Sequence, residues 1–271
     1  MRIWEKRYNL LNPERTETNI RYYNDDDLRK ILNVSLLVKN GYKISKVSKW
    51  DKNKLRDNVL EVTRTKTSEG DYIDRLLLHM INFDNISFSR VAEEIMATLG
   101  FEDAVSKIFF DFFVKIGTYW QVGSVFPAQE HYVTHIIRQK LIAAIDKLGV
   151  DNERDASILF FLPEKEMHEL SLLFYTYLSR KMGYNVIYLG QFVPYEELVK
   201  IQQMIKVDFV FTAFINSIPK EELEKYLVDL KNLFAKQKVF ITGWQLQIHE
   251  PELPRNVKIV KDYKEFKKYL K

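Results

Sequence analysis

The second half of this 271-residue chain alternates short apolar runs with amphipathic segments, and this pattern limits the possible fold more than any other feature. The apolar runs have the length of strands and lie near residues 156–162, 185–189, 208–214, 237–242 and 257–260. Segments with helical spacing follow them, near residues 169–182, 195–205, 220–235 and 262–270. Such alternation is typical of a doubly wound parallel sheet with right-handed crossovers. We expect a flavodoxin-like strand order, 2-1-3-4-5, with a ligand at the carboxyl ends of the first, third and fourth strands.

The loop after the first of these runs carries the residues with the clearest chemistry. The run ends at Pro163 and opens into a short charged loop that contains Glu166 and His168. A histidine in this position can bind a metal through one ring nitrogen while a nearby carboxylate holds the other. The alternative interpretation is a solvated surface histidine, the more usual role of a single histidine in a loop.

Residues 166–171 of this loop read Glu-Met-His-Glu-Leu-Ser and resemble the Asp-x-His-x-x-Gly signature of cobalamin-binding domains. The resemblance implies a Rossmann-like cobalamin-binding domain in which His168 is the lower axial ligand of cobalt and Glu166 holds its ring. Two positions depart from the signature, because Glu166 replaces Asp and Ser171 stands where Gly is usual. Ser171 adds a Cβ and a hydroxyl where the backbone and the corrin tail would approach closely, which predicts a reduced affinity.

Two later strand ends also depart from the family. Cobalamin domains usually carry Ser-x-Leu and Gly-Gly after the third and fourth strands, whereas this chain has Thr212-Ala213-Phe214 and Gly243-Trp244. The resemblance implies that Thr212 offers a hydroxyl to the nucleotide tail and that Gly243 lines the tail channel. Trp244 would crowd that channel, so we expect a tail pocket that is narrowed or shaped around a different tail.

Residues 72 to about 149 precede the sheet-forming half and have helical spacing throughout. Short polar or glycine-containing links divide them into four segments, near 72–82, 88–99, 102–119 and 127–148. Four helices with short links predict an antiparallel bundle. The expected fold class is therefore α plus α/β. Its expected parts are a DNA-binding head at 1–62, a linker at 63–71, a bundle at 72–150 and a Rossmann-like domain at 151–271.

Trp120 is followed by nine residues and then by Glu130 and His131. This spacing resembles the Trp-x9-Glu-His signature of the helical cap in cobalamin-dependent MerR regulators, a group that includes light-sensing repressors of carotenoid synthesis. The resemblance implies that Trp120 packs over the upper face of the corrin and that Glu130 and His131 contact the upper ligand. Some light-sensing members have a histidine directly after the tryptophan, but this chain has Gln121, which leaves light sensing and the upper ligand open.

Two other interpretations of these residues stay open. Trp120 has the alternative role of an ordinary core residue. His131 and His135 lie one helical turn apart and suggest a zinc pair, although the sequence offers no convincing third ligand and no His-Glu-x-x-His pattern.

The beginning of the chain is basic. Residues 1–66 hold 16 Lys and Arg against 9 Asp and Glu, whereas the remaining residues hold 25 against 28. This asymmetry favours a polyanionic partner for the first segment, with a solvated charged surface as the alternative. The pattern predicts a short helix at 2–8, a turn at 13–18, a strand at 20–23, a helix that starts after Asn24 and ends at Gly41, and a further helical segment.

This arrangement resembles the winged helix-turn-helix head of the MerR family over about 55 residues. The matching residues lie at 2–8, 13–16, 21–23 and 27–28. The resemblance implies contacts to DNA bases and phosphates from a recognition helix and phosphate contacts from a wing. The residues in these roles are Arg2, Arg7 and Tyr8 on the helix and Arg15 and Arg21 on the wing. Because the sequence starts at Met1 inside the recognition helix, we expect this chain to bind DNA weakly or not at all.

Together these resemblances predict a cobalamin-responsive transcriptional regulator of the MerR type, with adenosyl- or methylcobalamin as its cofactor and with DNA as a partner. We expect ligand-dependent homo-oligomerisation and a cytoplasmic location. No apolar run approaches the roughly 20 residues that cross a bilayer, and no signal-peptide core opens the chain, so we expect no membrane partner. The absence of cysteine excludes disulfides and thiolate metal ligands.

Two other functions compete with this one. A degenerate sensor that has lost cobalamin is favoured by Ser171 and Trp244 and opposed by Trp120, Glu130, Glu166 and His168. A corrinoid carrier of a methyltransferase or mutase would share the bundle and the sheet domain but not the DNA-binding head. We expect no enzyme activity, because no nucleophile–base pair or carboxylate dyad stands out.

Overall fold

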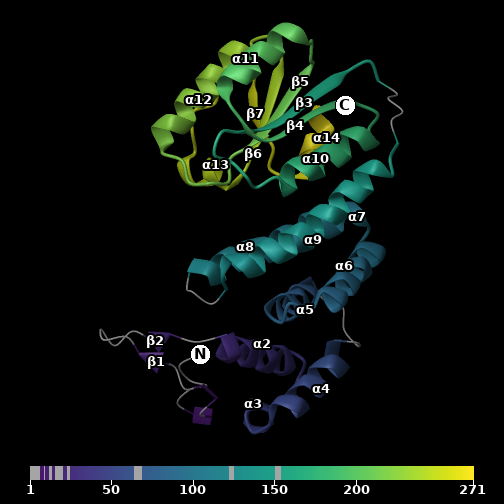
Figure 1. Ribbon diagram of the computed structural model, residues 1–271, viewed down its shortest axis with the longest axis vertical. Helices are drawn as coiled ribbons and strands as arrows, with labels where there is room; N and C mark the ends of the chain where they lie inside the picture. Colours follow the sequence, from purple (N-terminus) through teal and green to yellow (C-terminus); the bar gives the residue numbers. More distant parts are fainter. Residues whose placement is uncertain are drawn as a thin grey trace. The chain divides into compact units, whose positions relative to one another are not determined.

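The computed structural model describes residues 7–8, 10–11, 14–15, 21–22, 25–63, 69–121, 125–149 and 154–271. The chain forms two compact units, Met1–Ile136 and Ile137–Lys271. In the described residues, the first unit contains helices and one two-stranded ribbon, and the second contains a five-stranded parallel sheet with helices (Figure 1). The predicted fold class, α plus α/β, is confirmed. The boundary between the units falls inside a helix, so the expected domain limits stay predictions.

In the part of the head that the structure describes, a short ribbon is followed by the helices α2, α3 and α4. Strand β1 (Glu14–Arg15) pairs antiparallel with β2 (Arg21–Tyr22), with Arg15 opposite Arg21, so part of the expected turn at 13–18 is a strand. The helices are α2 (Asp25–Lys39), α3 (Ile44–Val47) and α4 (Lys52–Thr63). The segment after Gly41 was expected to be one helical stretch. It is two helices, because the Asp51 carboxylate accepts a bond of 2.8 Å from the Lys54 N–H and starts α4.

The bundle part of the first unit consists of consecutive helical elements. They are α5 (Glu69–Ile81), α6 (Asn85–Leu99), α7 (Phe101–Asp103), the π-helical η1 (Ala104–Phe109), α8 (Phe110–Gln121) and α9 (Pro127–Asp146). Helix α6 starts earlier than expected because Asp84 caps it, accepting 3.0 Å from the Ser87 N–H. The expected third helix is interrupted by the π-helical turn. Both ends of the expected linker are helical, since α4 reaches Thr63 and α5 begins at Glu69.

A buried carboxylate joins the head to the bundle within the first unit. Asp74 of α5 is 6% exposed. One of its oxygens accepts 2.6 Å from Lys39 of α2, and the other accepts 2.5 Å from Lys115 of α8. Leu78 of the same helix packs against the apolar core of the head. The orientation of α2 on α5 is thus fixed by packing and by charge.

The five strands of the second unit are all parallel and follow the predicted order. They are β3 (Ser157–Pro163), β4 (Asn185–Val193), β5 (Phe209–Ala213), β6 (Lys238–Thr242) and β7 (Val257–Ile259), arranged as β4-β3-β5-β6-β7. The connecting helices are α10 (Leu170–Lys181), α11 (Tyr195–Met204), α12 (Lys220–Leu233), α13 (Trp244–His249) and α14 (Tyr263–Tyr269). Of these helices, only the six-residue α13 was not predicted.

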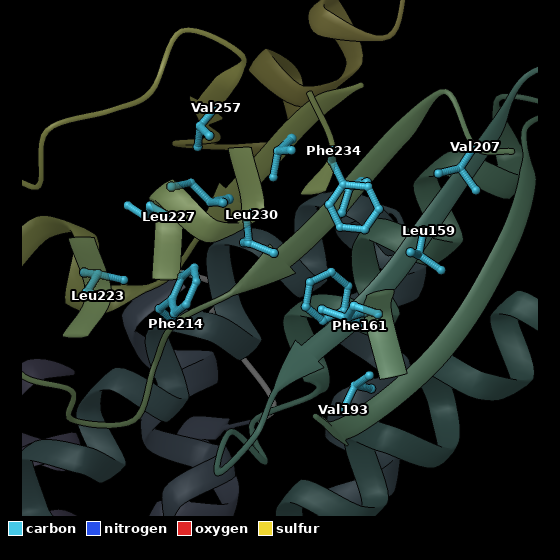
Figure 2. Close-up of a cluster of buried hydrophobic side chains, with 14 of the residues drawn as sticks. Leu159, Phe161, Val193, Val207, Phe214, Leu223, Leu227, Leu230, Phe234 and Val257 are labelled. Carbon is cyan, nitrogen blue, oxygen red and sulfur yellow. The ribbon is translucent and has the colours of Figure 1, made fainter. Parts of the chain in front are cut away.

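Apolar side chains fill both faces of this sheet. On one face, strand residues such as Leu159 and Phe161 pack with Leu223, Leu227 and other residues of α12 (Figure 2). On the other face, an aromatic cluster joins the sheet to α10 and α14. Its closest ring pairs are Tyr175–Phe211 at 4.5 Å and Tyr175–Phe266 at 4.9 Å between centroids. A sheet packed on both faces holds the carboxyl ends of its strands in fixed positions.

None of the helices in the described residues has both the length and the apolar composition required to cross a membrane.

Candidate functional site

The loop from β3 to α10 turns within six residues at the carboxyl edge of the sheet. Pro163 is the last residue of β3 and pairs with Val193 of β4. The Glu166 N–H donates to the Pro163 carbonyl at 3.0 Å, which closes the first part of the loop. Lys165 between them adopts a left-handed backbone with φ of 73°. This tight path places Glu166 and His168 beside the ends of the neighbouring strands.

Glu166 is the central acceptor of the loop. Its side chain is only 5% exposed. Oε1 accepts from the His168 N–H at 3.0 Å and lies 2.7 Å from His168 Nδ1. Oε2 accepts from the N–H groups of Ile215 and Asn216, both at 2.7 Å. The carboxylate therefore ties the loop after β3 to the segment after β5, and Asn216 reinforces the tie by donating to the Lys165 carbonyl at 2.6 Å.

These contacts set the charge on Glu166 and the tautomer of His168. Burial disfavours the carboxylate, but hydrogen bonds from the His168 ring and from the backbone N–H groups outweigh burial and hold the pKa of Glu166 below its ordinary value. An ionised carboxylate only accepts hydrogen bonds, so Nδ1 carries the proton and Nε2 is the basic ring nitrogen. The His168 side chain is 40% exposed. One imidazole nitrogen whose ring partner is held by a carboxylate is a donor set that fits a metal with a histidine ligand.

Glu169, directly after His168, is the second buried carboxylate of the loop. Its Oε1 accepts from Arg138 Nε of α9 at 2.5 Å, and its Oε2 accepts from the Tyr188 hydroxyl of β4 at 2.7 Å. Burial, together with the Glu169 carboxylate, raises the pKa of Tyr188 well above its ordinary value. Gln191 of β4 also donates to the Met167 carbonyl. Sequence reasoning missed Arg138 and Tyr188, because they lie 31 and 19 residues from Glu169 and belong to no motif.

The two predicted tail-contacting residues, Ser171 and Thr212, have buried hydroxyl groups. Ser171 lies in the first turn of α10, and Thr212 lies on β5 and is fully buried. Within the described part of the chain, neither hydroxyl has a hydrogen-bond partner. Other buried hydroxyls of the described residues, such as those of Thr176 and Ser179 on α10, also have no partner, so these two hydroxyls do not by themselves indicate a ligand.

Gly243 fills a position that admits no other residue. Its φ is 123°, and a Cβ built there would lie 2.2 Å from the Phe214 carbonyl oxygen. Phe214 in turn accepts from the Gln245 N–H at 3.2 Å. The glycine thus allows the ends of β5 and β6 to approach closely. Trp244 follows on α13 and is 56% exposed, and its predicted crowding of a tail channel stays a prediction.

The remaining predicted site residues lie in the first unit. Trp120 is near the end of α8, and its side chain falls outside the described residues. Glu130 is half-buried and His131 is exposed near the start of α9. Their roles toward an upper ligand stay predictions. In the part of the chain that the structure describes, no group of three or more His, Asp or Glu side chains is arranged to hold a metal ion.

The predicted DNA-contacting residues are only partly described. Arg7 is exposed and Tyr8 half-buried, and both are helical. Arg15 and Arg21 face each other across the β1–β2 ribbon, but their side chains and all of Arg2 lie outside the described residues. The DNA roles of these five residues therefore stay predictions.

Comparison with known families supports both sequence resemblances. Residues 1–54 match the family described as MerR HTH family regulatory protein, and residues 72–144 match the family described as B12 binding domain. The predicted combination of a MerR-type head and a cobalamin-binding domain is thereby confirmed.

Two relatives from Myxococcus xanthus are similar over most of their length. The chain is 27% identical over 257 residues to the HTH-type transcriptional repressor CarH, and the aligned region covers 92% of this chain and 85% of the relative. It is 22% identical over 251 residues to the HTH-type transcriptional repressor CarA, with 92% and 83% covered. Among solved structures, a Methanosarcina barkeri monomethylamine corrinoid protein matches with a TM-score of 0.58 at 15% identity. That match covers 75% of this chain and 98% of the other, and it shows a shared fold.

Proposed function

We propose that this chain, which joins a MerR-type helix-turn-helix segment to a B12-binding domain, is a cobalamin-responsive transcriptional regulator. The observation that carries the proposal is the Glu166–His168 pair, 2.7 Å apart at the carboxyl edge of the sheet, in a chain that also has a DNA-binding segment. Both similar relatives are described as transcriptional repressors, which supports regulation rather than catalysis.

Cobalamin would supply a cobalt ion that accepts a protein nitrogen as a ligand and carries an exchangeable group. His168 would bind the cobalt through Nε2, while Glu166 holds the proton on Nδ1. Ser171, Thr212 and Gly243 would meet the nucleotide tail, and Trp120, Glu130 and His131 would meet the upper group. We propose adenosyl- or methylcobalamin as the form bound, because an indole suits an apolar ligand face and a carboxylate suits ribose hydroxyls.

On the DNA side, Arg2, Arg7, Tyr8, Arg15 and Arg21 would contact the duplex. Phosphate contacts of this kind give affinity and register, and few of them read sequence. Cobalamin would shift the chain between assembly states of a homo-oligomer, which requires that it bind one state more tightly than the other. We place the protein in the cytoplasm and assign it no enzyme activity.

The proposal is tested by DNA selection from a library of random duplexes at low salt, in the dark, with and without adenosylcobalamin or methylcobalamin. Low salt strengthens phosphate contacts and allows weak binding to be measured. The expected result is a selected duplex, bound weakly, whose affinity changes when cobalamin is added, with the change lost in His168→Ala. Binding of both cobalamin and the selected duplex, with a DNA affinity that cobalamin does not change, would contradict a regulator and would favour a corrinoid carrier.

A further inference from the structure

Glu169 lies at the start of helix α10, but its carboxylate is bonded to other elements of the fold. It is the N-cap residue of α10, yet its side chain makes no capping bond to that helix. The residue is only 8% exposed, so its charge is largely withdrawn from water. This buried carboxylate does not cap α10, so contacts from other elements of the fold hold it in place.

Those contacts come from two elements on either side of the loop. Arg138 of α9 reaches one oxygen at 2.5 Å, and Tyr188 of β4 reaches the other at 2.7 Å. Both acceptor atoms are thereby occupied, and the buried charge has a cationic partner. Gln191, also on β4, binds the carbonyl of Met167. The residues on both sides of His168 are therefore anchored, one through its carbonyl and one through its side chain.

We infer that Arg138 and Tyr188 are positioning residues for His168: by fixing Glu169 they hold the His168 backbone in its place and link the loop to helix α9. The inference rests on the proposed function, because His168 needs a fixed position only if its ring binds a ligand. Glu166 orients the imidazole ring, whereas the Glu169 contacts fix the chain that carries the ring. Because both the ring and the backbone of His168 are already held in place, the residue loses less conformational entropy when it binds cobalt.

Two single substitutions test the inference in the full chain. Tyr188→Phe removes one hydroxyl, and Arg138→Met removes the cation but keeps an apolar stem. Matched controls are Tyr269→Phe, which breaks a tyrosine–glutamate bond of 2.9 Å on α14, and Arg255→Met, which removes an exposed arginine before β7. The first measurement is hydrogen exchange of residues 164–169 in the ligand-free chain. We expect faster exchange in both test variants and wild-type exchange in both controls.

The second measurement is the affinity for hydroxocobalamin, followed by visible absorption, in the wild-type and His168→Ala backgrounds. Loss of a residue that orients a metal ligand typically weakens metal binding about 10- to 100-fold, so we expect roughly a 10-fold loss for Arg138→Met. In the His168→Ala background that loss should vanish, because the residue acts through His168. A merely structural role would give the same loss in both backgrounds.

The outcomes separate the inference from the proposed function. If the wild-type chain binds hydroxocobalamin but the test variants bind it equally well and exchange at wild-type rates, the inference is overturned and the proposed function stands. If the wild-type chain binds no cobalamin, the proposed function falls, and the inference falls with it.

Discussion

Replacing Glu166 by glutamine separates the role of its charge from that of its shape. Glutamine has nearly the same size but exchanges one acceptor oxygen for an NH2 group. In the wild-type chain all four groups around the carboxylate are satisfied only if both oxygens accept. If the amide oxygen stays on the Ile215 and Asn216 N–H groups, the NH2 group faces the His168 N–H and Nδ1. Two donors then oppose each other at the backbone of His168.

The expected cost follows from these contacts. A part-buried backbone N–H that loses its acceptor costs about 1–3 kcal/mol, so Glu166→Gln should lower the free energy of unfolding by that amount. The ring responds as well, because the NH2 group can only donate to Nδ1. The proton then moves to Nε2, the nitrogen expected to bind cobalt, and we expect cobalamin affinity to fall about 10- to 100-fold.

The dependence on pH has a definite sign. Hydrogen bonds hold the pKa of folded Glu166 below its value in the unfolded chain, which is about 4.3. The carboxylate therefore stabilises the fold fully above pH ~4.3, and this stabilisation is lost as the pH falls through the folded pKa. The stability difference between wild type and Glu166→Gln should be constant near neutral pH and should shrink in acid.

Urea unfolding followed by tryptophan fluorescence measures the stability, and a visible absorption titration measures the affinity. Glu164→Gln is the matched control, since this exposed glutamate lies on the same loop. The reasoning is refuted if Glu166→Gln is as stable as the control at pH 7 and binds cobalamin with the wild-type affinity and spectrum.

Three further predictions concern the fold around the site. Gly243→Ala should lower the free energy of unfolding by more than about 3 kcal/mol, because a Cβ there would lie 2.2 Å from the Phe214 carbonyl oxygen and the backbone φ is unfavourable for alanine. A loss below about 1 kcal/mol in urea unfolding would contradict this. Asp74→Ala removes the ion-pair partner of Lys39 and Lys115, which are partly exposed, so we expect the free energy of unfolding to fall by about 1–2 kcal/mol, and by less in high salt. A loss that does not depend on salt would argue against an ionic contribution. Phe266→Ala empties the centre of the aromatic cluster and should cost about 3–5 kcal/mol by calorimetry, and a near-neutral result would show that the cluster is not tightly packed.

The sheet domain was predictable because its signals are local. Each buried strand is a short apolar run and each long helix has its own period, so the parallel order followed from alternation. Helix α13 was missed because six residues carry too little periodicity, and the break between α3 and α4 was missed because the start of α4 depends on a single capping aspartate, Asp51. The π-helical turn before α8 has no recognised sequence signal.

In the candidate site, too, the residues with a local sequence signal were predicted and those without one were not. Glu166 and His168 are two residues apart, so a spacing motif finds them. The carboxylate contacts that hold the loop to other parts of the chain join residues 19 to 50 positions apart, from Tyr188–Glu169 to Asn216–Glu166, and only the folded sheet brings them together. Gly243 was selected as a tail-channel glycine, and the structure adds a backbone reason for it that no spacing could reveal.

The most direct test of the account is a visible absorption titration of the purified chain with adenosyl-, methyl- and hydroxocobalamin, performed in the dark beside His168→Ala. The account predicts saturable binding by the wild-type chain, with a spectrum that is characteristic of histidine bound to cobalt and that changes in His168→Ala. Absence of binding by every form, or a bound spectrum identical in the two proteins, would contradict cobalt ligation by His168.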